Sequence, residues 1–201
     1  MKLLLLRHGE TEWTERGLLH GRLDAPLSAR GRQHAESAAR RLRGERFDAL
    51  YASPQGRAMQ TASILSEAVG IAPTPLDPLR EMNYGVTEGW PLSIVDPDGT
   101  GAFLVRPFIR AAMALTGEHP NQLAARVAAG MQMIQERHPD GRLIVVTHWG
   151  VLSMIMAHLL NGDPARWRDY GPWTACGITE LRTANGGWEI VRMNDGEHLE
   201  E

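Results

Sequence analysis

The sequence is poor in the features that place a protein in an oxidising compartment, in a membrane or on nucleic acid. Among its 201 residues there is one cysteine, Cys176, which cannot form a disulfide within the chain, and we interpret it as a packed thiol. No apolar run approaches the ~20 residues of a membrane span, and the leucines at 3–6 are too few for the core of a signal peptide. The formal net charge of −3 provides no overall positive field. We therefore expect a cytoplasmic protein that binds neither nucleic acid nor membranes.

Internal repeats, low-complexity tracts and linkers are lacking too. With 43% hydrophobic and 22% charged residues, a chain of this length suits one domain over residues 1–201 with one sizeable core. There is no metal-ligand pattern such as two histidines four residues apart beside a glutamate, so we expect no metal and no other cofactor. Six histidines are interpreted as structural or solvated: His20, His34, His119, His138, His158 and His198.

What the sequence does contain is reactive chemistry at the ends of apolar segments. Residues 2–6 form a leucine-rich run typical of a strand buried on both faces, and Arg7, His8 and Gly9 follow directly. Ligands of open α/β sheets bind just beyond the carboxyl ends of such strands. A guanidinium offers donors suited to phosphate oxygens, and a glycine lets the backbone approach a ligand closely. The arrangement indicates phosphate chemistry on His8.

Two further apolar runs end in the same way. Residues 142–147 lead into His148, and residues 47–52 lead into Ser53-Pro54 and then Arg57. We expect the serine to cap the next helix and the proline to take its first position, which puts Arg57 in an opening turn, where anions are favoured. If the three strands are parallel neighbours, two histidines and two arginines gather at one edge of the sheet.

Helical and strand patterns alternate along the chain, which predicts an α/β fold with a largely parallel sheet. Ser28 and Asn121 are the expected caps of two of the helices. Helices are expected at about residues 28–43, 54–69, from 121 onward and at 148–160, and a hairpin at residues 177–181 and 188–191.

Taken together, five separated blocks of the sequence resemble the histidine phosphatase superfamily, the phosphoglycerate-mutase-like proteins, from about Leu3 to Val191. The blocks are Arg7-His8-Gly9-Glu10-Thr11, Gly21-Arg22-Leu23-Asp24-Ala25-Pro26-Leu27-Ser28 with Gly31, Ser53-Pro54 with Arg57-Ala58-Met59-Gln60-Thr61-Ala62, Leu79-Arg80-Glu81-Met82-Asn83-Tyr84-Gly85 with Glu88-Gly89, and Thr147-His148-Trp149-Gly150. Their order and chemistry make the resemblance strong. It implies a three-layer α/β sandwich whose largely parallel central sheet is flanked by helices.

The resemblance also implies roles for five residues. His8 would be the nucleophile that becomes phosphohistidine, and Arg7, Arg57 and His148 would hold the transferring phosphoryl group. Glu81 would be the proton donor. These residue types suit the reaction, because a neutral imidazole can attack phosphorus, and fixed cations can stabilise the charge on the equatorial oxygens without a metal. The departing alcohol needs a general acid, and the same carboxylate can later activate water.

Three residues near these blocks leave alternatives open. Thr14 follows Trp13, where many family members have asparagine, and it is a candidate for a further substrate contact. Glu10 competes with Glu81 as the acid, although we favour a loop residue that contacts backbone N–H groups. Trp149 replaces a residue that is commonly small in the family, and core filling is favoured over a substrate contact.

The segment from about residue 90 to 119 is expected to hold specificity. Prolines and glycines mark a loop, and apolar residues between Phe103 and Met113 indicate a short amphipathic helix. In the family such an insertion roofs the active site. A lid and a simple surface cover for the core are equally supported.

The resemblance leaves two enzyme activities and one binding role. We favour the phosphatase branch, a metal-independent phosphomonoester hydrolase acting on small phosphorylated metabolites, because the insertion is modest and the tail after Val191 is acidic and ill suited to sealing a phosphate site. A cofactor-dependent phosphoglycerate mutase is the alternative. A non-catalytic phosphate-binding regulatory module is disfavoured by the intact His8 and Glu81. The sequence determines neither the substrate nor the oligomeric state.

Overall fold

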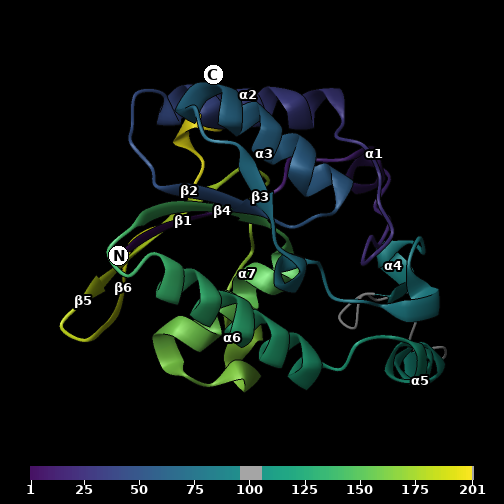
Figure 1. Cartoon of the computed structure of the whole chain (residues 1–201). Helices are drawn as coiled ribbons and strands as arrows, with labels where there is room; N and C mark the ends of the chain where they lie inside the picture. Colours follow the sequence, from purple (N-terminus) through teal and green to yellow (C-terminus); the bar gives the residue numbers. More distant parts are fainter. Residues whose placement is uncertain (96–105, 201) are drawn as a thin grey trace.

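The computed structural model describes residues 1–95 and 106–200, and its centre is a six-stranded sheet (Figure 1). The strands are β1 (Lys2–Arg7), β2 (Ala49–Ala52), β3 (Pro73–Pro75), β4 (Arg142–Thr147), β5 (Ile178–Ala184) and β6 (Gly187–Asp195). They lie in the order β3-β2-β4-β1-β5-β6, and the first four pair in parallel while β5 and β6 form an antiparallel edge. Arg7 lies opposite Thr147, so β1 and β4 end together at one edge of the sheet.

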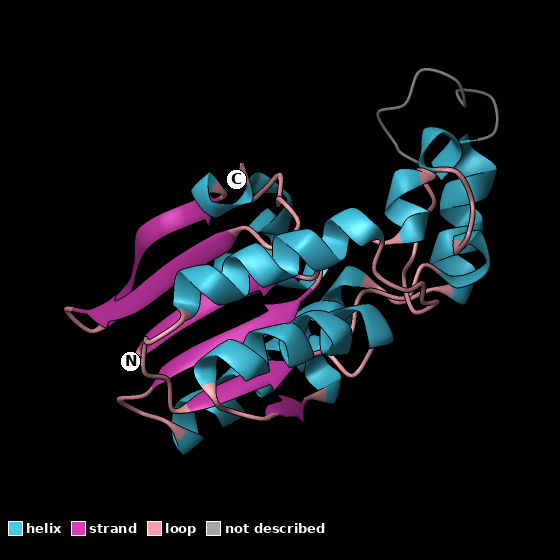
Figure 2. Ribbon diagram, turned by 90° about the horizontal axis from the view of Figure 1, so that it is seen from above, coloured by secondary structure: helices cyan, strands magenta, loops and turns pink. Residues whose placement is uncertain are grey.

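Helices cover both faces of the sheet, which confirms the expected three-layer α/β sandwich. Figure 2 shows α2 (Ala29–Leu42) and α3 (Gly56–Val69) lying across one face. On the other face lie α6 (Pro120–Arg137) and α7 (Trp149–Met156), as seen in Figure 1. α7 continues into a π-helical turn (Ala157–Asn161), and a 3₁₀ helix (Pro164–Asp169) follows.

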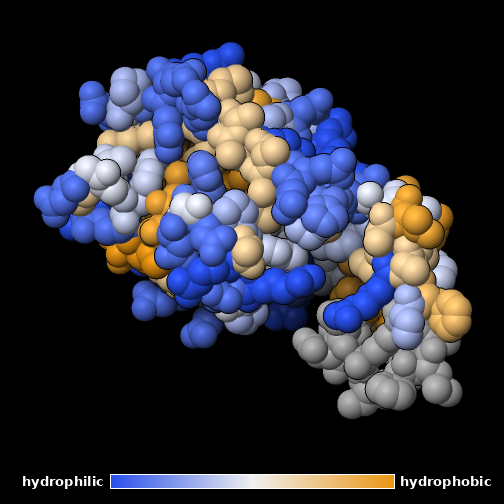
Figure 3. Space-filling model, turned by 90° about the horizontal axis from the view of Figure 1, so that it is seen from below, coloured by the Kyte–Doolittle hydropathy of each residue, from blue (hydrophilic) through white to orange (hydrophobic). Residues whose placement is uncertain are grey.

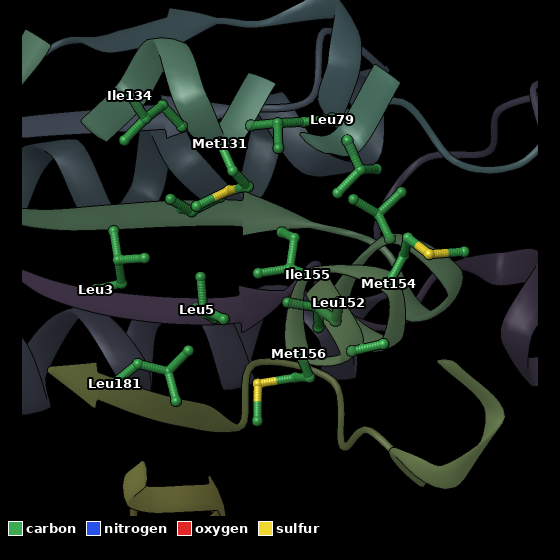
Figure 4. Packing of buried hydrophobic residues seen from close by; sticks show 14 of the residues in the cluster. Leu3, Leu5, Leu79, Met131, Ile134, Leu152, Met154, Ile155, Met156 and Leu181 are labelled. Atoms are coloured by element: carbon green, nitrogen blue, oxygen red, sulfur yellow. The ribbon is translucent and has the colours of Figure 1, made fainter. Parts of the chain in front are cut away.

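β1 ties the two halves of the core together through alternate leucines. Leu3 and Leu5 pack with residues of α6 and α7, as Figure 4 shows, whereas Leu4 and Leu6 pack with residues of α2 and α3. All four are fully buried, and burial of each leucine side chain contributes about 1.5–3 kcal/mol. His8, which directly follows β1, is therefore attached to a strand whose side chains are buried on both faces of the sheet.

The start of α3 differs from the expectation. Gln55, rather than Ser53, occupies the N-cap position of α3 (Gly56–Val69), and its side chain makes no capping bond. Ser53 stays in the extended chain because its N–H donates to the carbonyl of Val146, 2.9 Å away. Its hydroxyl accepts from the N–H of Gln55 at 3.3 Å and also faces a second partner, described below.

The start of α6 also differs, because His119 and not Asn121 is its N-cap. The ring Nδ1 of His119 accepts from the N–H of Asn121 at 3.2 Å, and Pro120 takes the first helical position, where its fixed φ suits the helix. The expected cap of α2, Ser28, and the expected carboxyl-terminal hairpin, which turns at Asn185-Gly186, are confirmed. None of the helices that the structure describes combines the length and apolar character needed to cross a membrane.

Three small helices lie beyond the carboxyl ends of the parallel strands. They are α1 (Glu12–Glu15), α4 (Leu92–Val95) and α5 (Arg106–Thr116). The helix expected in this region corresponds to α5, but Phe103 and Leu104 lie outside the described residues. Figure 3 shows apolar side chains gathered at this end of the molecule.

Candidate active site

His8 lies at the end of β1 with its two ring nitrogens in different environments. Nδ1 lies 2.8 Å from the carbonyl oxygen of Gly9, and because a carbonyl only accepts, Nδ1 must carry the proton. Nε2 therefore has a free lone pair, and it accepts a hydrogen bond from Nε of Arg57 at 3.2 Å. Burial lowers the pKa of His8 well below its ordinary value of 6.5, and the Arg57 and Arg7 cations lower it further. The ring is thus held neutral, with Nε2 as its nucleophilic atom.

Arg57, in the first turn of α3, is fully buried and holds the loop before it in place. Its NH1 group donates to the carbonyl of Leu23 and to the carboxylate of Asp24, both at 2.9 Å, and NH2 donates to the carbonyl of Gly21 at 2.9 Å. Because these partners fix the guanidinium plane, its Nε–H bond to His8 has a defined direction.

His148 comes to the same place from the end of β4. Its ring centroid lies 5.1 Å from that of His8, and its Nε2 lies 2.7 Å from the hydroxyl of Ser53. Its other nitrogen, Nδ1, is buried without a protein partner, as is Nε of Arg7. Two buried and unsatisfied polar atoms beside His8 suit a bound anion. His148 itself is fully buried and does not reach the cavity surface.

Glu81 lies in the same cavity as His8 and is almost fully buried. Its two carboxylate oxygens accept from the N–H groups of Met82 (2.8 Å) and Gly150 (3.2 Å). A Cβ at Gly150 would lie 2.8 Å from the carboxylate, so a side chain there would crowd it. Burial raises the pKa of Glu81 above its ordinary 4.5, against the effect of these hydrogen bonds. A carboxyl group with a raised pKa is suited to donating a proton.

Two other sequence candidates lie elsewhere. Glu10 forms an ion pair with Arg30 at 3.7 Å and is not among the cavity-lining residues. The Thr14 hydroxyl caps α1 by accepting from the N–H of Thr11 at 3.3 Å, and it too is away from the cavity wall. This geometry provides no support for a contact between Thr14 and substrate.

The cavity in front of His8 has a volume of about 700 Å³, within the range of small-molecule sites. Arg7, His8, His20, Arg57 and Glu81 form the polar part of the lining, called the floor below. The remaining lining, called the walls, is largely apolar apart from Tyr84, Arg110 and Arg168. Its lining residues are Arg7, His8, Leu18, Leu19, His20, Gly21, Arg57, Glu81, Tyr84, Leu92, Ile94, Val95, Ile109, Arg110, Met113, Trp149, Trp167 and Arg168.

Sequence reasoning missed several of these lining residues. His20 was interpreted as structural or solvated, yet its ring centroid lies 6.2 Å from that of His8, and its Nε2 lies 2.6 Å from the Thr11 hydroxyl. Burial lowers the pKa of His20 to about 3, so it too is neutral. Its position one residue before the Gly21 block was the available signal. Trp149 was expected to fill core, and it does pack against the core while also lining the cavity.

The chemistry that this arrangement can perform is phosphoryl transfer to an imidazole. It combines a neutral imidazole, the guanidinium groups of Arg7 and Arg57, and a carboxyl group whose pKa is raised by burial. Among residues 1–95 and 106–200, no group of three or more histidine, cysteine, aspartate or glutamate side chains could hold a metal ion.

Comparisons with known proteins agree with this geometry. A model of the histidine phosphatase superfamily (branch 1) matches residues 3–196. The protein named "Uncharacterized phosphatase PhoE" from Bacillus subtilis (strain 168) is 26% identical over 198 residues, which span 97% of this chain and 95% of that protein. The "Probable phosphoglycerate mutase GpmB" of Yersinia enterocolitica is 27% identical over 224 residues, which span 100% of this chain and 95% of its own.

A solved structure extends the likeness to three dimensions. The mycobacterial glucosyl-3-phosphoglycerate phosphatase in complex with VO3 aligns with a TM-score of 0.80 at 29% identity, over 96% of this chain and 98% of that one. The family model covers nearly the whole chain and includes each residue that builds the site. The protein therefore belongs to the histidine phosphatase superfamily (branch 1).

Proposed function

We propose that this protein is a metal-independent phosphomonoester hydrolase that acts on small phosphorylated metabolites through a phosphohistidine at His8. The observation that carries the proposal is the environment of His8, a neutral ring whose Nδ1 proton is held by Gly9 and whose Nε2 is held by Arg57, in a cavity that also contains Glu81. The single thiol, Cys176, is buried and its pKa is raised to about 12, which suits a structural role in a reducing cytoplasm.

In the first step, Nε2 of His8 attacks phosphorus while the bond to the alcohol oxygen breaks. Arg7 and Arg57 line the cavity and stabilise the negative charge on the equatorial oxygens. His148 does not line the cavity itself, and we propose that its Nδ1, which has no protein partner among the described residues, contacts a phosphoryl oxygen once the group is bound to His8. The carboxyl of Glu81 gives its proton to the departing oxygen, so an alcohol rather than an alkoxide leaves.

In the second step, water attacks the phosphohistidine and the bond between phosphorus and Nε2 breaks. The Glu81 carboxylate left by the first step accepts a proton from that water, which regenerates the acid and releases inorganic phosphate. Glu10 is not suited to either task, because its carboxylate points to Arg30 and lies off the cavity wall.

The position of the carboxyl-terminal residues favours hydrolysis over mutase activity. Residues 197–199 form a 3₁₀ turn that packs against α2, where the His198 ring bonds the carbonyl of Cys176 at 3.1 Å. None of residues 196–200 lines the cavity. A site that they do not cover admits water to the phosphoenzyme.

The proposal is tested by following the phosphoryl group. During turnover of an alkyl phosphate, the wild-type protein should carry acid-labile, base-stable phosphate, and released phosphate should equal substrate consumed, with or without a chelator. The His8→Ala variant should carry no such phosphate and should lose nearly all turnover, while its circular dichroism spectrum stays that of the wild type. Substantial turnover by His8→Ala, or loss of activity on chelation with recovery on adding zinc or magnesium, would refute the mechanism.

Absence of any phosphoenzyme would favour a non-catalytic binding module.

The phosphoglycerate mutase alternative has one specific support, the 27% identity to GpmB across the whole chain. It is separated by the fate of the phosphoenzyme. With 3-phosphoglycerate and a trace of 2,3-bisphosphoglycerate, we expect free phosphate and little 2-phosphoglycerate. Accumulation of 2-phosphoglycerate with little free phosphate would establish the mutase instead.

A further inference from the structure

The walls of the cavity differ in chemistry from its floor. Three separate segments supply apolar side chains: Leu18 and Leu19 before the Gly21 loop, Ile94 and Val95 of α4, and Ile109 and Met113 of α5. All of them line the cavity together with Leu92, Trp149 and Trp167. The polar lining side chains outside the floor are, among the described residues, Tyr84, Arg110 and Arg168. The phosphoryl group occupies the floor, so the alcohol portion of a substrate meets the apolar walls.

Two tryptophans form one of these walls next to the reacting groups. Trp149 directly follows His148, and its ring meets that of Trp167 edge to face, with centroids 6.0 Å apart and an interplanar angle of 81°. The guanidinium carbon of Arg168 lies 4.8 Å from the Trp167 ring centroid. Trp167 is almost fully buried, and a Cβ at Gly171 would lie 3.1 Å from the Trp149 ring, so both rings are held in place. Fixed aromatic rings bind apolar groups at little cost in side-chain entropy.

These walls discriminate between polar and apolar alcohols. A substrate hydroxyl that loses water without gaining a protein partner weakens binding roughly tenfold or more. An added phenyl ring that is buried against apolar walls strengthens binding by roughly tenfold or more. The cavity is also far larger than a phosphoryl group needs, which leaves room for such a ring.

We infer that the preferred substrates are phosphomonoesters of bulky apolar alcohols, rather than phosphorylated sugars or glycerates. The inference rests on the proposed phosphatase function and makes it narrower. The apolar alcohol lies between the tryptophan pair on one side and the α4 and α5 side chains on the other, with its ester oxygen toward Glu81.

Three primary alkyl phosphates with similar leaving groups test this preference. We expect kcat/KM to be at least 10-fold higher for 2-phenylethyl phosphate than for propyl phosphate, and to be lowest for glycerol 1-phosphate, which matches propyl phosphate in carbon number. A kcat/KM for glycerol 1-phosphate equal to or above that for 2-phenylethyl phosphate would overturn the inference.

A matched pair of variants in α5 tests whether the side chains of this helix that line the cavity cause the substrate preference. Met113 lines the cavity, whereas Leu115 is 84% exposed and does not. Met113→Ala should lower the ratio of kcat/KM for 2-phenylethyl over propyl phosphate about 3- to 10-fold, and Leu115→Ala should leave the ratio unchanged. Ile94→Ala in α4 should act as Met113→Ala does. An unchanged ratio in both wall variants would show that these helices do not bind the alcohol.

Binding of phosphonates separates this inference from the proposed function, since phosphonates are not hydrolysed. Calorimetry with 3-phenylpropylphosphonate should give a Kd at least 10-fold lower than with propylphosphonate, even if no phosphate ester is turned over. Turnover of all three esters together with equal affinities for the two phosphonates would support the phosphatase proposal and refute the preference for apolar alcohols. Tighter binding of the phenyl phosphonate without turnover of any ester would support the preference for apolar groups and remove the phosphatase proposal.

Discussion

Two titratable side chains of the cavity are shifted in opposite directions by the same physical cause. Burial lowers the pKa of His8 because it disfavours the charged imidazolium, and it raises the pKa of Glu81 because it disfavours the carboxylate. Burial thus favours the uncharged form of both groups, the neutral imidazole of His8 and the carboxylic acid of Glu81. The proposed attack and leaving-group departure use these two uncharged forms.

Glu81→Gln is predicted to separate alkyl from aryl substrates. The amide cannot transfer a proton, so kcat/KM for alkyl phosphates should fall about 10²- to 10⁴-fold, with a much smaller loss for aryl phosphates, whose phenolate leaves unaided. kcat/KM is the informative parameter because it reports transfer to His8 and not the later hydrolysis. In the wild type, activity on alkyl phosphates should decline as pH rises through the raised pKa of Glu81, and this limb should vanish in the variant.

Glu10→Gln is the matched control for that experiment. Its carboxylate pairs with the exposed Arg30, so both substrate types should be affected equally and mildly. If the selective loss on alkyl phosphates appeared in this variant, the acid would be Glu10.

Among the elements, the first turn of α2 and the chain after β1 are in direct backbone contact. A Cβ at Gly31 would lie 2.0 Å from the carbonyl oxygen of Glu10, and a Cβ at Gly9 would lie 2.6 Å from the carbonyl oxygen of Gly31. α2 thus sets the position of the backbone next to His8. Glycine at both positions is what allows this approach.

Gly31→Ala is predicted to damage both stability and catalysis. Alanine favours a helix, but the clash with the Glu10 backbone should outweigh this and lower the free energy of unfolding by about 1–3 kcal/mol. Displacement of the 9–10 segment should also reduce kcat. Gly187→Ala, at a position with open space around the added carbon, is the control, and urea unfolding with steady-state kinetics measures both. Equal behaviour of the two variants would mean that the 9–10 segment yields without consequence.

At the scale of the whole molecule, burial in the folded state lowers the pKa values of four histidines among the described residues: His8, His20, His148 and His198. In the unfolded chain their pKa is near 6.5, so below that pH the unfolded state binds more protons than the folded state. Stability from these groups is therefore complete above about pH 6.5 and is lost as pH falls. Glu81 has the opposite sign, but it is one group against four.

The predicted consequence is a free energy of unfolding that falls steadily from pH 7 toward pH 5. Each histidine contributes a slope of up to about 1.4 kcal/mol per pH unit in this window. For His20, whose folded pKa is about 3, the loss continues to that pH. His20→Gln should remove the contribution of one proton, so the slope of the free energy of unfolding against pH should fall by about 1.4 kcal/mol per pH unit. Urea unfolding at several pH values measures this slope. The same slope in wild type and variant would show that His20 is protonated in the folded state.

Several parts of the fold and site were predictable because their signals are local. Strands 2–7 and 142–147 are apolar runs, and helix starts such as Ser28 have side chains that bond their own turn. The caps at Gln55 and His119 were not predictable, because the first follows from sheet pairing of Ser53 and the second from a ring nitrogen that accepts an N–H. Residue propensities at the helix start predict neither contact.

The sequence by itself determined the family and the α/β class, and it provided the candidates for the reactive groups, since these depend on residue types at the ends of apolar runs. Only the tertiary structure decided which nitrogen of His8 carries the proton, which carboxyl is buried in the same cavity, and that His20 and Trp149 line that cavity. Those properties arise from burial and from contacts between segments far apart in the chain, such as Gly9, Arg57 and Glu81. A pKa or a tautomer belongs to an environment rather than to a residue type.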